Sequence, residues 1–460
     1  PEESIRLSNK FGKTWGGPYP VNKVNTCLFM VDEASIRHVL SENSNNYEKG
    51  DGSRSFFREL LGNGIFLSDG DQWFVHRKIM SKMFSRNLLR RTSEVIQMKL
   101  EQIASLLLNA METEEQYVGS AEPRISLDLQ DIFFRMTFDV TSFVALGCEI
   151  DSIGTYGAEG GQHPFAEAFG QMQEAILQRF GDPFYKVKRV LQIGSRERRI
   201  TVLSRTLADH AASIINDRCR TIEDGSELGP DILTRYLEYS KRNNVPMSNE
   251  ELKDVVTNVL IAGRDATACL LTWSFYELSK RPDVIDKIIS EVENVCTNGE
   301  DSDYSYDNVS KLQYTHAFVL EVLRLHPSVA IDHRRAINND RLPDGTFVPA
   351  GAMINWMPIQ IGRSKHIWGE DALEFKPERF IDLKEPSPFK YPAFGAGPRL
   401  CLGKPLALMT VKTTLAYLLP KFQFIDRLGH SGEAKWKMVI SMKGGFLVDV
   451  CSRKILTVHI

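Results

Sequence analysis

The chain has 460 residues, of which 42% are hydrophobic and 25% are charged, and this ordinary globular composition excludes a wholly disordered protein. Its 56 Lys and Arg residues nearly balance its 59 Asp and Glu residues and give a net charge of −3, which argues against a dedicated nucleic-acid-binding protein. The seven cysteines are scattered and form no C-x-x-C pair, so they indicate a reducing environment rather than a disulfide framework or a zinc ribbon.

The first part of the chain predicts short strands and turns, followed by helices. A strand is expected at Lys23–Val31 and a short amphipathic helix at Asp32–Leu40. Apolar residues at helical rather than alternating spacing then predict helices over Asp71–Arg91, Thr92–Leu108 and Asp131–Leu146. Loops rich in glycine and acidic residues are expected at Asp151–Gln162, Glu223–Gly229 and Asn298–Asp307.

The longest helical pattern covers Ser248–Lys280. Ser248 and Glu251 form a capping box at its start, and its middle is apolar almost all round, so we expect this helix to be buried. Further on, the sequence predicts short strands and a second apolar helix at Pro405–Leu419. Because no linker divides the pattern, residues 1–460 are expected to form one large, mainly α-helical domain with small β-sheets.

The most informative stretch is the ten-residue segment Phe394–Gly403, which contains one cysteine. Two glycines and a proline predict a tight loop, and a helix from Pro405 places Cys401 just before a helix N-terminus, where a thiolate is favoured. Gly403 would let a flat partner approach closely, and Arg399 could pair with an anionic group on it. The glycine spacing excludes a P-loop, and the segment lacks the dinucleotide-binding fingerprint. Taken alone, the segment also fits a buried structural cysteine.

At every fixed position this segment resembles the haem-binding loop of the cytochrome P450 family. The resemblance implies the cytochrome P450 fold, with the long central helix over the haem, and it implies that Cys401 is the axial thiolate ligand of the iron of haem b. Electron donation from a thiolate favours O–O cleavage, which is the chemical reason for a cysteine here. Phe394, Gly395, Arg399 and Gly403 then belong to the loop that binds the haem.

A second motif resembles the family's E-x-x-R. Glu321 and Arg324 match it, and Arg379 lies in a P-E-R-F segment between that motif and the cysteine loop. The resemblance implies that these three residues form a buried network that holds the fold around the haem. Without the resemblance, charged residues at this spacing commonly form an exposed ion pair.

Four residues are candidates for binding the haem carboxylates by resemblance. Trp73 and Arg77 match the family's W-x-x-x-R, His333 lies where many members place an arginine or histidine, and Arg399 precedes the cysteine by two residues. The first two also fit an arginine packed over an exposed indole. The two arginines that follow His333 compete with it for this role.

The central helix carries the string AGRDAT, beginning at Ala262, which resembles the family motif A-G-x-(D/E)-T-(T/S). Small residues at Ala262 and Gly263 are expected to allow a bend and to leave room for dioxygen over the haem. Asp265 and Thr267 are the catalytic candidates, although the charged pair here also fits a salt bridge in a solvent channel. The departure from the family is Ala266, which lacks the hydroxyl that normally helps to hold the proton-delivering water. The sequence therefore predicts proton delivery through Asp265 with water or Thr267.

Within the family, residues 128–139, 182–189 and 262–273 resemble the fatty-acid ω-hydroxylases of plants and related eukaryotes. The leading hypothesis is a haem-thiolate monooxygenase that inserts one oxygen atom from O2 into an unactivated C–H bond, at or near the terminal carbon of a long-chain fatty acid. The pocket candidates implied by the resemblance are all apolar, as a lipophilic substrate requires: Phe66, Val259, Ala262, Val329, Ile331 and Met442. The alternatives are a decarboxylase, a peroxygenase or a rearrangement on the same haem, and a non-catalytic haem sensor.

No flavin or iron–sulfur motif occurs in the chain, so the resemblance implies that electrons come from NADPH through a separate NADPH–cytochrome P450 reductase, with cytochrome b5 as a candidate second partner. Lys390, Lys404 and Lys412 are candidates for docking an acidic partner, although they also fit solubilising charge. The chain begins at Pro1 without a spanning apolar run. Eukaryotic relatives usually carry an N-terminal anchor, so a longer parent is expected at the endoplasmic reticulum membrane, with this domain facing the cytosol.

Overall fold

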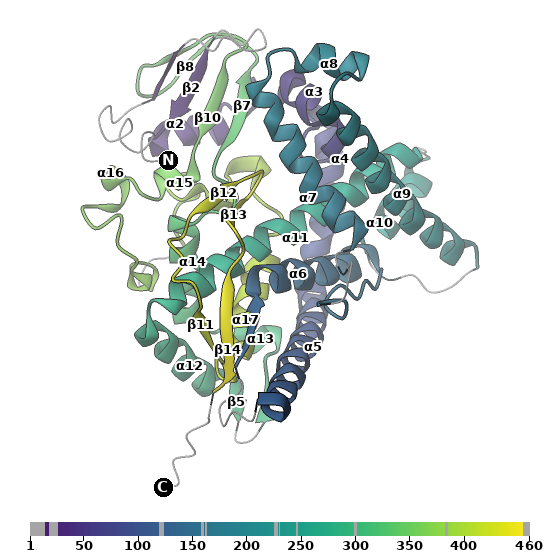
Figure 1. Ribbon diagram of the computed structural model, residues 1–460. Coiled ribbons are helices and arrows are strands. Elements are labelled where there is room, and N and C mark those ends of the chain that lie inside the picture. The colour runs from purple at the N-terminus through teal and green to yellow at the C-terminus, as the bar shows by residue number, and fades with distance from the viewer. Residues whose placement is uncertain are drawn as a thin grey trace.

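The computed structural model describes residues 14–17, 26–118, 124–157, 161, 163–224, 229, 231–244, 247–298, 301–381 and 385–453. They form a mainly helical body with small sheets (Figure 1), which confirms the predicted fold class. The α-helices are α2 (Glu33–Arg37), α3 (Gly50–Leu61), α4 (Gly70–Ser81), α5 (Arg86–Val118), α6 (Leu129–Leu146), α7 (Pro164–Leu177), α8 (Tyr185–Leu191), α9 (Ser195–Glu223), α10 (Ile232–Asn243), α11 (Asn249–Ser279), α12 (Pro282–Cys296), α13 (Tyr306–Val309), α14 (Gln313–Leu325), α15 (Pro358–Ile361), α16 (Lys365–Trp368) and α17 (Lys404–Leu418).

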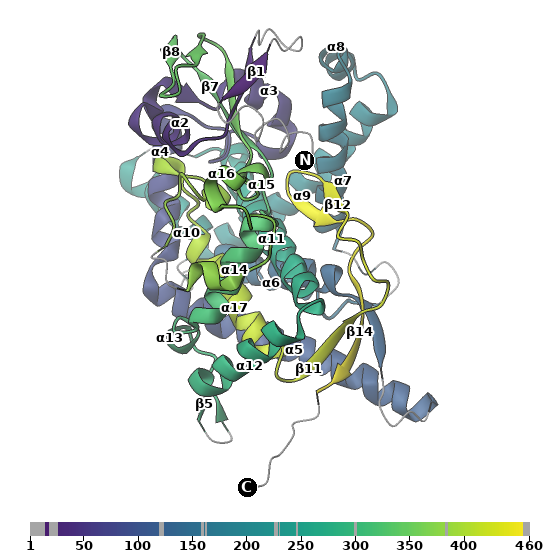
Figure 2. The same cartoon turned by 90° about the vertical axis from the view of Figure 1, so that its left-hand side faces the viewer.

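Helix α11 is the central element of the body. Its start is the predicted capping box, because the N–H of Glu251 donates to the side chain of Ser248 and the N–H of Ser248 donates to the Glu251 carboxylate at 2.8 Å. The helix packs along α6 and also contacts α9, α14 and α17 (Figures 1 and 2). Within the described residues it is the one helix long and apolar enough to cross a membrane, but 72% of that apolar window is buried. The predicted burial of the long helix is confirmed.

The helices before α11 differ from the prediction in one boundary. The sequence suggested a division between Arg91 and Thr92, but α5 is continuous through both. The break lies earlier, at Ser85, whose extended backbone (φ −68°, ψ 150°) separates α5 from the 3₁₀ turn that follows α4. A single residue with extended dihedrals ends a helix without changing the spacing of apolar residues, so the periodicity could not locate it.

The strands form one larger sheet and several small ones: β1 (Trp15–Gly17), β2 (Cys27–Met30), β3 (Tyr47–Glu48), β4 (Ile125–Asp128), β5 (Thr297–Asn298), β6 (Asp301–Ser302), β7 (Asp332–Ala336), β8 (Asp340–Arg341), β9 (Phe347–Val348), β10 (Met353–Trp356), β11 (Phe422–Asp426), β12 (Ala434–Trp436), β13 (Ile440–Met442) and β14 (Leu447–Ser452). The five-stranded sheet has the order β1-β2-β10-β7-β3, and β11-β14-β4 form a three-stranded sheet. Among the strands that the structure describes, β2 and β10 are the one pair that runs in parallel, with Cys27 opposite Met353. This sheet brings β7 from the C-terminal half beside β3 from the N-terminal segment.

The predicted strand and loops are partly outside the described residues. β2 confirms the later part of the strand expected at Lys23–Val31, whose residues 23–25 are not described. The described residues of Asp151–Gln162 are turns, and 225–228 of Glu223–Gly229 are not described. Of the loop expected at Asn298–Asp307, residues 303–305 lie outside any helix or strand, but Asn298 pairs with Asp301 in short antiparallel strands and α13 begins at Tyr306. Strands of two residues are too short to show an alternating pattern, so the sequence did not predict them.

Candidate functional site

The cysteine loop is closed by its own backbone and by one essential glycine. The N–H of Cys401 donates to the carbonyl of Phe394 at 2.9 Å, just before α17 begins. Gly397 has φ +66°, and a Cβ there would lie 1.8 Å from the carbonyl oxygen of Leu40. Only glycine therefore fits at this point, and the tight loop predicted from the sequence is present.

The thiol of Cys401 is surrounded by protein atoms but keeps solvent-accessible surface. Burial raises its pKa, while the backbone N–H groups of Gly403 and Lys404 and the charge of Arg77 oppose that rise. The helix N-terminus thus reaches the sulfur as expected, although burial outweighs it, and a metal ion bound to the sulfur would favour the thiolate. Within the described residues, no cluster of three or more His, Cys, Asp or Glu side chains could hold a metal.

Gly403 has no structural reason of its own to be glycine. Its φ is −79°, which any residue adopts, and a Cβ would meet only the Cys401 Sγ at 3.8 Å and a Phe84 ring carbon at 4.0 Å. Both are ordinary van der Waals contacts. The missing side chain leaves room beside the thiol, as the predicted haem would require.

Trp73, Arg77 and Arg399 lie together beside the cysteine loop. Arg77 Nη1 donates to the carbonyl of Leu400 at 2.6 Å, and the Arg399 guanidinium lies 4.5 Å from the centre of the Trp73 ring system. Arg399 also pairs with Asp69 at 2.6 Å. The three candidates are therefore assembled as expected, and Arg399 is already partly neutralised by a carboxylate that the sequence did not single out.

Two further cations reach the same region, one from the residue between β3 and α3 and one from β7. Lys49 Nζ pairs with Asp332 at 2.6 Å, and Arg334 Nη1 lies 3.5 Å from the same carboxylate. His333 Nε2 is hydrogen-bonded to the hydroxyl of Ser53 at 2.5 Å. Lys49 was missed by sequence reasoning because nothing around it in the chain marks it, whereas Arg334 was considered only as a competitor of its neighbour.

The charges of this cluster do not cancel. Lys49, Arg54, Arg77, Arg334 and Arg399 are cations, and Asp69 and Asp332 are the anions among them, so positive charge is in excess. Burial and the nearby Arg334 lower the pKa of Lys49 to about 8 and that of Arg399 to about 10. Burial also lowers the pKa of His333 to about 4, with Lys49 adding to the effect. Crowded, partly buried cations favour an anionic partner, such as the carboxylates of a haem.

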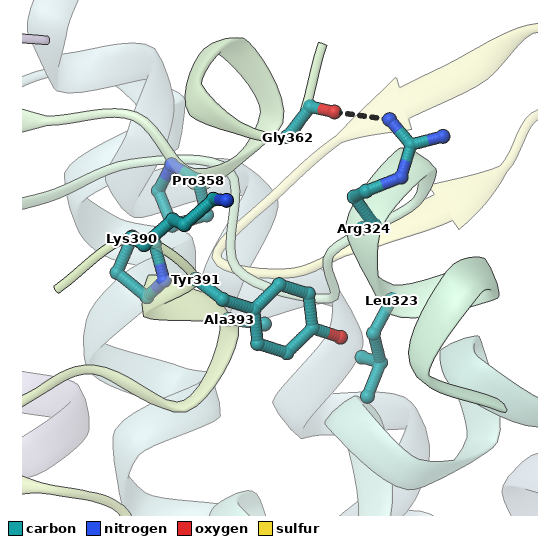
Figure 3. Close-up of a pocket in the computed structure, with 8 residues that line it drawn as sticks. Leu323, Arg324, Pro358, Gly362, Lys390, Tyr391 and Ala393 are labelled. Atoms are coloured by element: carbon teal, nitrogen blue, oxygen red, sulfur yellow. Dashed lines mark hydrogen bonds between the residues drawn. The ribbon is translucent and has the colours of Figure 1, made fainter. Parts of the chain in front are cut away.

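The E-x-x-R motif forms a buried ion network. The Arg324 guanidinium donates to both Glu321 oxygens at 2.7 and 2.8 Å, and neither side chain has exposed surface. Arg379 Nε lies 3.4 Å from Glu321 and its other nitrogens bind Asp371. Arg324 also donates to the carbonyl of Gly362 at 2.5 Å, in the crevice shown in Figure 3. The arrangement is that of a structural network rather than an exposed pair.

The polar residues of α11 face α7 and α6. Asp265 is buried and accepts from Gln173 Nε2 at 2.7 Å and from Arg264 Nη1 at 2.9 Å. Thr267 is also buried. Ala262 and Ala266 retain exposed surface one turn apart, so they share one face of the helix.

Gly263 has a different role from the one expected. A Cβ there would lie 2.3 Å from the hydroxyl of Thr141 on α6, so its glycine permits the close packing of α11 on α6. The expectation that it leaves room for dioxygen is corrected, because the space belongs to the neighbouring helix. Ala262 remains the small residue with exposed surface.

Three of the predicted pocket residues present apolar surface. Phe66, Val329 and Ile331 are 38%, 36% and 44% exposed. The segment around Phe66 touches α11 through Gly64, whose Cβ would lie 2.4 Å from Asn258, and Arg399 donates to the carbonyl of Ser68 at 2.9 Å.

Some of the pocket candidates lie on a segment beside α11, and others are buried in the core. Ser328 Oγ donates to the carbonyl of Ala266 at 2.8 Å, which places the start of the segment containing Val329 and Ile331 beside α11. Val259 is mostly buried, and Met442 is fully buried in the main core with its backbone paired to Gln130. Met442 therefore presents no surface to a ligand.

The three lysines proposed for partner docking do not share one surface. Lys412 is buried, donates to the carbonyls of Ser310 and Leu312, and has its pKa lowered to about 8 by burial. Lys412 is therefore no longer a candidate for docking a partner, because its charge does not reach solvent. Lys404 pairs with Glu385, and Lys390 lies 5.1 Å from the Trp368 ring.

Comparisons with known proteins agree with this geometry. The family model described as Cytochrome P450 matches residues 5–443. The chain is 33% identical to Cytochrome P450 704B1 of Arabidopsis thaliana, over 93% of this chain and 87% of that protein. It is 34% identical to Cytochrome P450 704C1 of Pinus taeda, over 90% and 81%, and 32% identical to Cytochrome P450 CYP94D109 of Paris polyphylla, over 94% and 86%.

Proposed function

The chain belongs to the cytochrome P450 family and is a haem-thiolate monooxygenase, and from that premise we propose that it hydroxylates a long-chain fatty acid at or near its terminal carbon. The observation that carries the substrate class is the exposed apolar surface of Phe66, Val329 and Ile331 around the site. Such a wall accommodates an alkyl chain and offers few polar groups to anything else. The likeness of three stretches to plant fatty-acid ω-hydroxylases supports the same class.

In this proposal Cys401 is the axial ligand and the cation cluster binds the haem carboxylates. Arg77 and Arg399 reach the loop that contains the cysteine, and Lys49 and Arg334 extend the cluster toward β7. The bound haem supplies the activation of O2 that C–H hydroxylation needs. The residues of the chain orient the haem, exclude water with apolar surface, and hold a carboxylate at Asp265 for proton delivery.

The test is a panel of fatty acids of different chain lengths, incubated with NADPH and a cytochrome P450 reductase. We expect a substrate-dependent spin-state shift and a product heavier by one oxygen atom, with the hydroxyl at or near the terminal carbon. A spin-state shift without any oxygenated product from the whole panel would contradict the proposal.

Ala266 favours a second candidate, in which the same haem acts as a peroxygenase or decarboxylase. The residue supplies no hydroxyl at the position where the family usually has one, so proton delivery to oxygen is less constrained. Turnover with peroxide but not with NADPH and reductase would identify this alternative.

We also propose that the protein associates with the endoplasmic reticulum membrane and receives electrons there from the reductase. Apolar side chains more than half exposed gather at and beside α8: Phe180, Phe184, Val187, Val190, Leu191 and Ile193. Lys186, Lys188 and Arg189 are interleaved with them. Apolar surface mixed with basic charge is typical of segments that lie on an anionic membrane.

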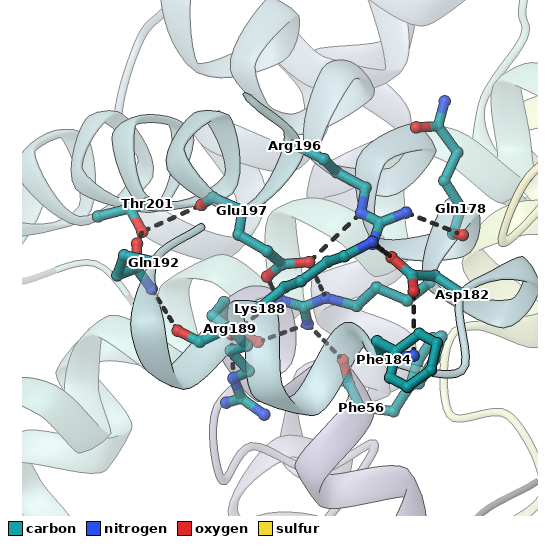
Figure 4. A network of polar contacts seen from close by, with 12 residues as sticks. Phe56, Gln178, Asp182, Phe184, Lys188, Arg189, Gln192, Arg196, Glu197 and Thr201 are labelled. Atoms are coloured by element: carbon teal, nitrogen blue, oxygen red, sulfur yellow. Dashed lines mark hydrogen bonds and ion pairs between the residues drawn. The ribbon is translucent and has the colours of Figure 1, made fainter. Parts of the chain in front are cut away.

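An ion network beneath α8 supports an orientation in which the apolar side chains of this helix face the membrane (Figure 4). Arg179 is buried and binds the carboxylates of Glu59 on α3 and Glu197 on α9. Asp182 binds Lys188 and Arg196. These contacts fix the base of α8, so its apolar side chains face outward by construction. Vesicle co-sedimentation of the chain and its V190S/L191S variant tests the surface, and equal binding of the two would contradict it.

A further inference from the structure

Residues 62–68 form a loop between α3 and α4, and the start of this loop is held by two buried side chains of α11. The N–H of Asn63 donates to Asp254 Oδ2 at 2.8 Å, and Asn258 Nδ2 donates to the carbonyl of Leu61 at 2.8 Å. Asp254 and Asn258 are both buried, so bulk solvent hardly competes for these hydrogen bonds. We call these two α11 residues the clamp of the loop.

Two glycines of the loop permit its close contact with the clamp. Gly62 has φ +54°, and a Cβ there would lie 2.0 Å from the carboxyl carbon of Asp254. A Cβ on Gly64 would lie 2.4 Å from Asn258 Nδ2. Each side chain of the clamp therefore occupies the space that a side chain of the loop would need, and the backbone reaches α11 only because both residues are glycine.

The other end of the loop is attached to the cysteine loop. The N–H groups of Leu67 and Ser68 both donate to the carbonyl of Gly64, at 3.1 and 3.0 Å, and close the loop into a compact turn. Arg399 donates to the carbonyl of Ser68 at 2.9 Å. Phe66 thus lies between two attachments, and its side chain keeps exposed apolar surface.

The clamp shares one face of α11 with the two small residues described above. Asp254, Asn258, Ala262 and Ala266 follow one another at spacings of four residues, which places them along one face of the helix. The loop covers the first two of these positions, whereas Ala262 and Ala266 retain exposed surface. The place of the loop on α11 therefore decides where the uncovered part of this face begins.

We propose that Asp254 and Asn258 are positioning residues that determine which carbon of the substrate is hydroxylated, by fixing the loop that carries Phe66. The inference rests on the proposed hydroxylation of a fatty acid, and it assigns the choice of carbon to residues that do not touch the substrate. The C–H bonds of a terminal methyl group are stronger than those of inner methylene groups, so attack at the terminus requires that the chain is held in place. A wall fixed at both ends stops the chain at one depth, whereas a loose wall also admits inner carbons to the site.

The test compares the ratio of terminal to inner hydroxylation in variants of the clamp. Asn258→Leu has a similar size but no donor, and Asp254→Ala removes the acceptor. A shift of about 1 Å in a bound group changes its rate by up to about 10²-fold, so we expect both variants to lower this ratio by about threefold to tenfold. Asp254→Asn keeps an acceptor oxygen for the N–H of Asn63 and should retain the wild-type ratio.

Ser274→Ala is the matched control on the same helix. Ser274 is buried, and its Oγ donates to the carbonyl of Leu270 at 2.7 Å. It lies about 24 Å along α11 from Asn258, so this variant loses a buried hydrogen bond without disturbing the loop. An unchanged ratio in Asn258→Leu and Asp254→Ala, or an equal decrease in Ser274→Ala, would overturn the proposal.

A further variant perturbs the same contact from the side of the loop. Gly64→Ala places a methyl group against Asn258 and should lower the ratio of terminal to inner product as Asn258→Leu does. Gly52→Ala is its control, because a Cβ at Gly52 would meet no atom within 4 Å. A wild-type ratio in Gly64→Ala would contradict the proposed positioning.

Limited proteolysis tests the clamp without any substrate. Chymotrypsin cleaves after aromatic residues, and cleavage after Phe66 requires that the loop leaves its place on α11. The loss of one hydrogen bond should accelerate this cleavage by about fivefold to tenfold in Asn258→Leu and Asp254→Ala, but not in Ser274→Ala. Unchanged cleavage in both clamp variants would overturn the proposal. If fatty-acid hydroxylation itself is wrong, cleavage still accelerates while no fatty acid of the panel gives an oxygenated product, so the two failures are distinguishable.

Discussion

The buried pair formed by Glu321 and Arg324 allows a quantitative prediction of stability. Glu321→Gln removes the charge that neutralises a guanidinium with no exposed surface. Arg324 would keep its bonds to the carbonyls of Gly362 and Glu374. The dipoles of these carbonyls, however, stabilise the guanidinium charge less than a carboxylate does. Breaking one partner of a buried ion pair costs about 3–5 kcal/mol.

The size of the protein converts this free energy into a temperature shift. An unfolding entropy of about 2.1 cal/mol/K per residue gives roughly 1 kcal/mol/K for a chain of this length. We therefore expect Glu321→Gln to lower Tm by roughly 3–5 °C. Differential scanning calorimetry of the haem-loaded protein measures the shift directly.

An exposed pair nearby provides the control, and a double variant isolates the interaction. Lys287 and Glu378 are 3.0 Å apart, and about half of each side chain is exposed, so Lys287→Met should cost less than about 1 kcal/mol. Combining Glu321→Gln with Arg324→Met should cost less than the sum of the single changes by about 2 kcal/mol, because the second change removes the uncompensated charge. Equal losses for Glu321→Gln and Lys287→Met would refute the reasoning.

Three further predictions concern the haem site. Cys401→Ser should abolish the thiolate-type Soret band of the reduced, CO-bound protein, while Cys451→Ser should keep it; a retained band in the first variant would exclude Cys401 as the ligand. Lys49→Met removes one cation of the cluster and should speed haem transfer to apomyoglobin roughly tenfold, about 1.4 kcal/mol, and an unchanged rate would show that the cluster does not bind the haem carboxylates. Ala266→Thr restores the usual hydroxyl and should lower the share of peroxide relative to product; an unchanged share would argue against water-based proton delivery.

Local features of this fold were predictable from the sequence. The capping box of Ser248 and Glu251 spans one helical turn, so its spacing alone determines its geometry. The loop before Cys401 is similarly local, because glycine and proline fix its backbone within ten residues. The break at Ser85 was not predictable, since it depends on the dihedral angles of one residue and not on a pattern.

The cation cluster could not be predicted, because its members meet only through tertiary structure. Lys49 and Asp332 are 283 positions apart, and no feature near either one marks the other. Gly263 shows that a sequence motif can also suggest the wrong contact. Its position in a recognisable string suggested a role toward the cofactor, whereas the contact that requires glycine is with Thr141 on another helix.

The residues of the cation cluster lie far apart along the chain, and this has a consequence for biosynthesis. Lys49 and Arg77 are made early, but their partners Asp332 and Leu400 and the ligand Cys401 emerge much later. At ribosomal rates of about 5–20 residues per second, the interval between Lys49 and Cys401 lasts roughly 20–70 s. The nascent chain cannot retain haem during that time, so cofactor capture must follow near-complete translation, and prematurely terminated chains should leave the ribosome without haem.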